Sequence, residues 1–174
     1  MNKKYGITGL ILIIVLATVM ISGCIGDNTD KFTNAVTFEG MTFYLPEGFE
    51  SIDNSSDSSV VYQIYSDDVG HNHSHDEGPD DHSHDEGPDN VIGLFYYPLV
   101  SKSKVLSNIK LDSDYSSINE SASYGGHFGY SAELTSSNGE KIKLFVFEKD
   151  GKTLAISLSS GFNLNEHIPK IIGS

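Results

Sequence analysis

The sequence predicts an α+β domain, in which helices pack on a mostly antiparallel β-sheet. Three observations predict this class. Short runs of β-branched and aromatic residues recur between residues 36 and 158, with turn residues between them. The last three runs are separated by Asn-Gly and Asp-Gly turns, as in an antiparallel meander. Two further stretches, 101–110 and 163–172, have the pattern of short helices.

The first 23 residues have the three parts of a secretory signal peptide. Two lysines give a positive start, residues 7–21 form an apolar core, and two small residues precede a cleavage point. The tetrapeptide Ile21-Ser22-Gly23-Cys24 resembles the lipobox of prokaryotic lipoproteins. This resemblance implies a signal peptide at 1–23, a lipid on the sulfur of Cys24, and a protein anchored to the extracytoplasmic face of the cell membrane.

The alternative for this N-terminus is an uncleaved membrane helix. The apolar core is 15 residues long, which is short of the roughly 20 residues that a bilayer-spanning helix needs. A polar segment, residues 24–34, follows and predicts a tether between the anchor and a domain at 35–174. The domain opens with two β-like runs, 36–38 and 41–45, that predict a hairpin.

Residues 51–59 contain mostly Ser, Asp and Asn, and they predict a loop. Two strands are expected next, at 60–65 and 91–97. An ordinary hairpin needs about 2–5 loop residues, so the segment 67–90 is a long insert. Its Gly, Pro and carboxylate residues bury too little apolar surface to offset the entropy cost of ordering, and we expect a disordered loop without a ligand.

The second half of the domain begins with the predicted helix at 101–110, whose apolar residues face the core. Residues 112–126 are rich in Ser, Asp and Gly. Three more strands are expected at 128–134, 142–147 and 153–158. The closing helix at 163–172 has Asn165 as a candidate cap, although Pro169 lies far inside for a helix.

Three short motifs resemble small PsbP/Mog1-type lipoprotein domains. They are Phe-Tyr-Leu-Pro-Glu-Gly-Phe at 43–49, Gly125-Gly126-His127-Phe128-Gly129, and Phe147-Glu148-Lys149-Asp150-Gly151-Lys152. The resemblance implies a curved antiparallel sheet between helices, in a prokaryotic and specifically archaeal lipoprotein. Roles in that family are varied and often non-catalytic, so the resemblance assigns no catalytic residue.

The insert holds most of the functional information. It contains the unit His-Ser-His-Asp-Glu-Gly-Pro-Asp twice, at 73–80 and 82–89, and five of the chain's seven histidines lie in it. His-x-His spacing puts both rings on one side of an extended strand. Imidazole and carboxylate groups are ligands of zinc, nickel, copper and cobalt, and the sequence does not select among them. The candidate ligands are His71, His73, His75, Asp76, His82, His84 and Asp85.

The expected function is therefore to bind or buffer a divalent transition metal, zinc or nickel, at the cell surface, with a metal transporter as the expected partner. Two alternative roles for the insert are a solvated low-complexity spacer and a pH sensor built from its histidines. If the insert is a spacer, we expect a non-catalytic structural or interaction lipoprotein that binds an envelope protein.

Composition excludes other classes. The chain has no arginine, and its net charge of −13 becomes −15 when the two leader lysines are removed. Nucleic-acid binding needs a basic surface, so it is not expected. No nucleophile elbow, phosphate-binding loop or His-Glu-x-x-His motif occurs, so we expect no enzyme.

A few further residues carry weaker signals. His127 is expected at a turn or strand edge, and His167 on the surface. Five tyrosines in or beside the predicted strands are expected to pack on the two faces of the sheet. Asn-x-Ser triplets at 54–56, 72–74 and 119–121 fit the N-glycosylation pattern, and their use depends on the host.

Overall fold

The fold was analysed in a computed structural model of the chain. The structure describes residues 31–67, 90–112, 114–135, 139 and 141–174. The strands are β1 (Phe32–Phe38), β2 (Met41–Pro46), β3 (Glu50–Ser56), β4 (Val61–Ser66), β5 (Val91–Tyr97), β6 (Tyr115–Tyr124), β7 (His127–Thr135), β8 (Lys141–Lys149) and β9 (Lys152–Leu158). The helices are α2 (Lys102–Asp112) and α3 (Leu164–Ile172).

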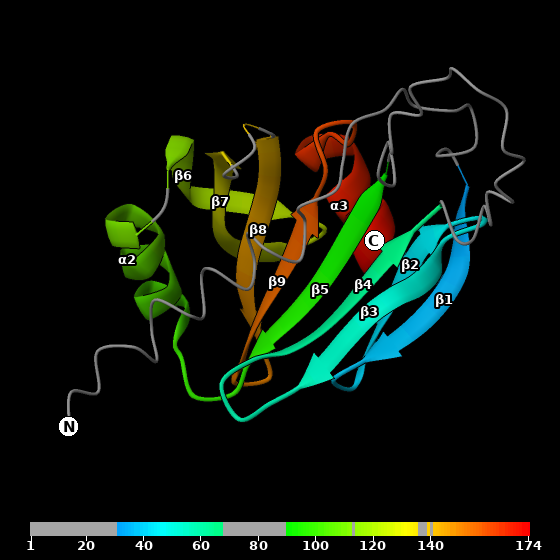
Figure 1. The fold of residues 1–174 in the computed structure, drawn as a ribbon, viewed down its shortest axis with the longest axis horizontal. Helices are drawn as coiled ribbons and strands as arrows, with labels where there is room; N and C mark the ends of the chain where they lie inside the picture. Colours follow the sequence, from blue (N-terminus) through cyan, green and yellow to red (C-terminus); the bar gives the residue numbers. More distant parts are fainter. Residues whose placement is uncertain (1–30, 68–89, 113, 136–138, 140) are drawn as a thin grey trace, which may run out of the picture.

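Seven strands form one sheet in the order β3-β4-β5-β9-β8-β7-β6, and β1 pairs with β2 in a separate two-stranded sheet. Every neighbouring pair is antiparallel. The predicted α+β class with an antiparallel sheet is therefore confirmed (Figure 1). The predicted meander is confirmed as β7-β8-β9, and positive φ angles at Asp150 and Gly151 form its last turn.

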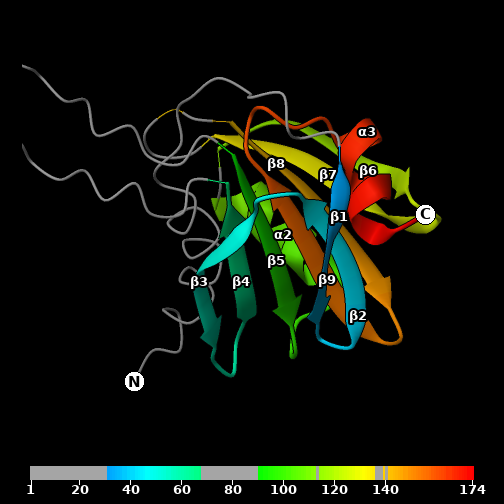
Figure 2. The same cartoon turned by 90° about the vertical axis from the view of Figure 1, so that its right-hand side faces the viewer.

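The large sheet is covered on both faces, as Figure 2 shows. The β1–β2 hairpin and α3 pack on one face, where Phe43, Leu45 and Ile168 join a core with residues of β5, β8 and β9. Helix α2 covers the other face through Val105 and Ile109. Side chains alternate between the two cores because successive residues of a strand point to opposite faces.

The tyrosines follow this division between the two faces. Tyr62 and Tyr97 pack on the side of α2, and Tyr65 and Tyr96 pack on the side of α3, as expected. Both apolar layers are buried, so each face of the sheet packs into its own core.

Two boundaries differ from the predictions, and one strand lies where no element was predicted. Strand β1 begins at Phe32, inside the stretch 24–34 that was expected to be a tether. Residues 50–56 form β3 where a loop was predicted at 51–59, and the Ser-rich stretch 112–126 contains β6. Strands β3 and β6 are the two edges of the large sheet. An edge strand is stabilised by backbone pairing on one side and tolerates exposed polar side chains, so composition alone indicated neither strand.

The cap of α3 also differs from the prediction. Asn163, and not Asn165, caps the helix: its side chain accepts hydrogen bonds from the backbone N–H groups of Asn165 and Glu166. Pro169 lies inside the helix, which nevertheless runs on to Ile172 and ends at Gly173 in the left-handed conformation. Among the helices of the described ranges, neither reaches the length and apolar content that a membrane crossing requires.

Candidate functional site

The predicted metal ligands and the lipidation site lie outside the described residues. The ligands fall at 68–89 and Cys24 falls at 1–30. The structure does describe the residues at which the insert begins and ends.

The base of the insert is the open end of the β4–β5 hairpin. Ser66, the last residue of β4, pairs with Val91, the first residue of β5. Just beyond this pair, the side-chain amide of Asn90 donates a hydrogen bond of 2.6 Å to the carboxylate of Asp67. Asn90 is only 2% exposed. The predicted hairpin is thus confirmed, and its two strands stay paired up to the point where the insert starts.

A third strand fixes this base within the sheet. The backbone N–H of Val91 donates to the hydroxyl oxygen of Ser159 at 3.2 Å, and the backbone N–H of Ser159 donates to the carbonyl of Val91 at 3.1 Å. Ser159 follows β9 directly and is buried. Because β5 lies inside the sheet between β4 and β9, the base of the insert is held from both sides.

The N-terminal end of the described domain lies at the same end of the sheet (Figure 1). The backbone N–H of Glu47 donates to the carbonyl of Lys31 at 2.9 Å. Glu50, three residues further on, pairs with Ser66 at the base of the insert. Lys31, the first described residue, therefore lies near the base of the insert.

Exposed carboxylates surround this end of the sheet. Glu47, Glu50 and Asp67 are all exposed. They add negative charge beside an insert that itself contains no lysine. A concentration of like charge on one surface raises the local concentration of cations.

The described part contains two histidines, His127 and His167. Within the described ranges, no group of three or more His, Cys, Asp or Glu residues is arranged to hold a metal ion. His127 begins β7 and its ring lies 5.0 Å from the ring of Phe147. Burial lowers the pKa of His127, and the nearby charge of Lys149 lowers it further. Its predicted position beside a turn is confirmed.

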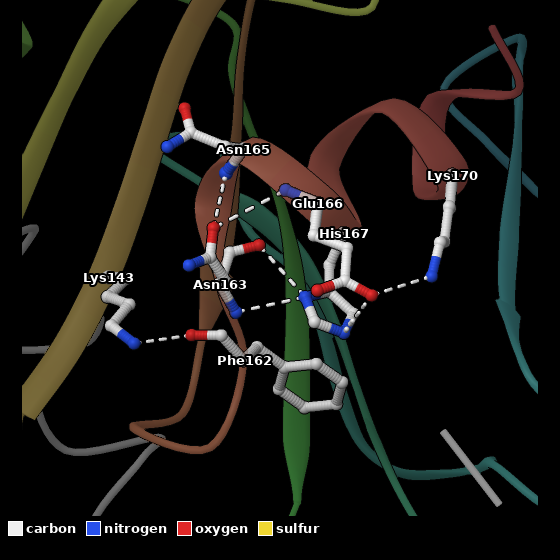
Figure 3. A network of polar contacts seen from close by, with 7 residues as sticks. All are labelled: Lys143, Phe162, Asn163, Asn165, Glu166, His167 and Lys170. Atoms are coloured by element: carbon white, nitrogen blue, oxygen red, sulfur yellow. Dashed lines mark hydrogen bonds and ion pairs between the residues drawn. The ribbon is translucent and has the colours of Figure 1, made fainter. Parts of the chain in front are cut away.

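His167 corrects the prediction of a surface histidine, because its exposed fraction is 8%. Its ring lies between Phe32 and Phe162, at centroid distances of 5.8 and 5.2 Å. Its Nδ1 accepts a hydrogen bond of 2.9 Å from the backbone N–H of Asn163 (Figure 3). The sequence contained a signal for this position, because His167 lies four residues before the buried Ile171 on the same helix face.

Charged side chains complete this network around the start of α3 (Figure 3). Lys143 donates to the backbone carbonyls of Ser160 and Phe162, which tie β8 to the loop before the helix. Glu166 accepts a 3.0 Å hydrogen bond from Lys170, one turn along. That hydrogen bond lowers the pKa of Glu166, and the positive charge of Lys170 lowers it further.

An open groove of about 290 Å³ lies between this network and strands β6 to β8. Its lining is mainly polar and includes Ser117, Asn119, Glu133, Lys143 and Asn165. Most of these polar groups already bond to neighbours: Glu133 accepts from Ser116, and Lys143 holds the loop before α3. We therefore find no cluster in the groove arranged for acid–base or nucleophilic chemistry.

No protein-family profile matches the chain, and no curated protein matches it significantly.

Proposed function

We propose that this protein is a lipid-anchored cell-surface protein that binds or buffers divalent transition metal ions through its His/Asp/Glu-rich insert. One observation carries the proposal: the unit His-Ser-His-Asp-Glu-Gly-Pro-Asp occurs twice within 73–89, next to His71. Each unit supplies two imidazoles and a following carboxylate, which are ligand types that zinc and nickel accept.

The arrangement of the described domain supports a place close to the membrane. Six residues separate Cys24 from Lys31, and a chain of that length spans at most about 25 Å. Lys31 bonds to Glu47, and the β-strand after Glu47 begins beside the base of the insert. With a lipid on Cys24, metal captured by the insert is held near the membrane, where a metal transporter can receive it.

The chemistry of the ligands predicts how binding depends on pH. Histidine binds metal only as neutral imidazole, and its ordinary pKa is about 6.5. Binding should therefore weaken as the pH falls below this value. A long polar insert also spends part of its binding energy on becoming ordered, so we expect an affinity in the micromolar range, about −8 kcal/mol.

Calorimetric titration of the full, detergent-solubilised chain with ZnCl₂ and NiCl₂ tests the proposal. A variant in which the five histidines of 71–84 are replaced by Asn should lose binding, whereas the matched variant His127→Asn should keep it. If the unchanged chain binds neither ion better than the five-fold variant, the metal proposal is wrong.

The anchor is tested separately. Cys24→Ser should move the protein from the membrane fraction to the medium, because the thioether to the lipid cannot form. A mass consistent with lipid on Cys24 of the unchanged chain is the matching positive result.

A second function is favoured by exposed apolar side chains on the described domain. Leu99 is 82% exposed and Phe128 is 77% exposed. Single exposed apolar residues are normal on protein surfaces, and these two are the contacts to test for a non-catalytic interaction lipoprotein of the PsbP/Mog1 type. Loss of a co-purifying envelope protein in Leu99→Ser and Phe128→Ser, with unchanged metal binding, would favour this function.

A further inference from the structure

Two Asn-x-Ser triplets lie on the described domain, and they occupy its two edge strands. Asn54-Ser55-Ser56 is in β3 and Asn119-Glu120-Ser121 is in β6. These strands form the opposite edges of the seven-stranded sheet. Asn54 and Asn119 are both exposed. By sequence and exposure alone, the two triplets are equivalent acceptors for N-glycosylation.

Their backbone conformations are different. Asn54 to Ser56 pair in regular register with β4, from Gln63 to Val61. In β6 the register shifts between Asn119, which pairs with Ser131, and Ala122, which pairs with Gly129. The intervening residues, which complete the second triplet, therefore lie in a β-bulge that departs from the regular ladder.

The side chain of Asn119 closes a turn across its own triplet. Its Oδ1 accepts a 3.0 Å hydrogen bond from the backbone N–H of Ser121. This Asx turn brings the asparagine side chain and the serine two residues later onto one side of a compact bend. Asn54 accepts no such bond from Ser56 among the hydrogen bonds of the described residues, since its triplet is extended in the ladder.

We propose that Asn119 is an N-glycosylation site of the folded domain and that Asn54 is not. A transferase must accommodate the whole triplet in its own site. The triplet at Asn119 has already left the regular ladder after Asn119, whereas the triplet at Asn54 would have to detach from β4. The proposal requires that the domain is exported, as in the proposed function, but it does not depend on metal binding.

The reaction needs a sugar donor attached to a polyisoprenyl phosphate lipid. The bond between the anomeric carbon of the sugar and the phosphate oxygen breaks, and its electron pair stays on the phosphate. A new bond forms between the anomeric carbon and Nδ2 of Asn119, and Nδ2 loses one proton. No oxidant or reductant takes part.

A sugar at Asn119 would lie over the outer edge of β6 and at the rim of the polar groove, which Asn119 lines. An uncovered edge strand presents unpaired backbone groups to other chains. A bulky, soluble group at this edge would block edge-to-edge pairing. Glycosylation at this position would therefore protect the sheet at its edge.

The test is peptide mass spectrometry of the full chain purified from the membranes of the organism that encodes it. Cleavage before aspartate separates Asn54 from Asn72 and from Asn119. We expect a hexose-containing mass on the Asn119 peptide and the unmodified mass on the Asn54 peptide. The sugar should be absent in Ser121→Ala, which keeps Asn119, and present in Ser121→Thr.

A second measurement separates selection by the fold from selection by sequence. The purified chain is incubated with an oligosaccharyltransferase and a polyisoprenyl-linked sugar, either folded or kept unfolded by urea throughout the reaction. The folded chain should be modified at Asn119, and the unfolded chain at both positions. Equal modification of Asn54 and Asn119 in the folded chain, or a bare Asn119 in the native protein, overturns the proposal.

Discussion

The side-chain amide of Asn90 donates a 2.6 Å hydrogen bond to the carboxylate of Asp67, across 23 positions of the chain. This bond joins the two ends of the insert directly beside the last backbone pair of the β4–β5 hairpin, Ser66 with Val91. The hairpin is therefore closed by described residues alone. We therefore expect the rest of the domain to fold independently of the residues between Asp67 and Asn90.

The first prediction concerns removal of the insert. Replacing residues 68–89 by Asn-Gly shortens the connection from 22 residues to 2, and closing a shorter loop loses less entropy, by roughly 2 kcal/mol. The free energy of unfolding, measured by chemical denaturation, should rise by up to that amount while zinc binding disappears. A scrambled insert of the same composition is the control and should leave stability unchanged. A large loss of stability on replacement would show that the insert supports the fold.

The second prediction concerns the amide that closes the base. Asn90 is buried, so Asn90→Ala removes a hydrogen-bonded group from the interior and should lower the free energy of unfolding by about 1–3 kcal/mol. Asp67→Asn keeps an acceptor oxygen on an exposed residue and should change stability little. An equal loss of unfolding free energy in the two variants, in the same denaturation experiment, would contradict the greater importance of the buried Asn90 amide.

Most of the sheet could be predicted because its inner strands carry continuous apolar signals. Val91 to Tyr97 and Ile142 to Phe147 are mostly buried, and each was expected as a strand within one or two residues of its bounds. The edge strands β3 and β6 could not be predicted in this way. Their side chains are exposed and polar, and only the long-range pairing with β4 and β7 makes them strands.

The candidate site also has one part that the sequence predicts and another that depends on long-range contacts. The doubled histidine unit is a local pattern, so sequence alone is enough to propose its candidate ligands and their spacing. The base at Asp67 and Asn90 depends on two residues 23 positions apart, and the environment of His167 depends on Phe32, far earlier in the chain. Contacts of this kind arise from the topology of the sheet, whereas the local pattern of His167 beside Glu166 suggested an exposed side chain.

A third prediction follows from the burial of His167. His167→Ala removes a ring packed between Phe32 and Phe162 and should lower the free energy of unfolding by about 2–4 kcal/mol, as for other large buried side chains. Zinc affinity at a pH where the variant is folded should be unchanged, because this histidine serves the core. His127→Ala is the matched control, with a smaller loss expected at a partly exposed strand end. A variant of normal stability but weakened zinc affinity would place His167 in the metal site instead.

A fourth prediction concerns the close approach of β7 to β8. A Cβ added at Gly129 would lie 2.0 Å from the backbone oxygen of Val146, which cannot move without breaking the ladder. Gly129→Ala should therefore cost about 3 kcal/mol or more, which is at the upper end for a single substitution. Ser131→Ala, two residues along the same strand, should cost about 1 kcal/mol. Similar midpoints of thermal unfolding for the two variants would contradict the predicted clash.

The last prediction is a loss of stability at alkaline pH. Tyr97 and Tyr130 are 1% and 2% exposed. Burial raises the pKa of both phenols, and the charge of Tyr97 raises that of Tyr130 further. In the unfolded chain tyrosine ionises near pH 10. Above that pH the folded protein therefore keeps protons that the unfolded chain has lost.

It follows that these two tyrosines do not change the free energy of unfolding with pH below about pH 10. Above that pH the free energy of unfolding falls, by up to about 1.4 kcal/mol per pH unit for each tyrosine. Tyr97→Phe should make this decline shallower, and the double variant with Tyr130→Phe shallower still. Neither hydroxyl has a hydrogen-bond partner among the described residues, so both variants should keep normal stability at pH 7. Tyr115→Phe, at an exposed position, should decline like the unchanged protein. If urea denaturation at pH 7 and pH 11 gave the same slope with pH in all three variants, buried phenols would not be the cause of alkaline unfolding.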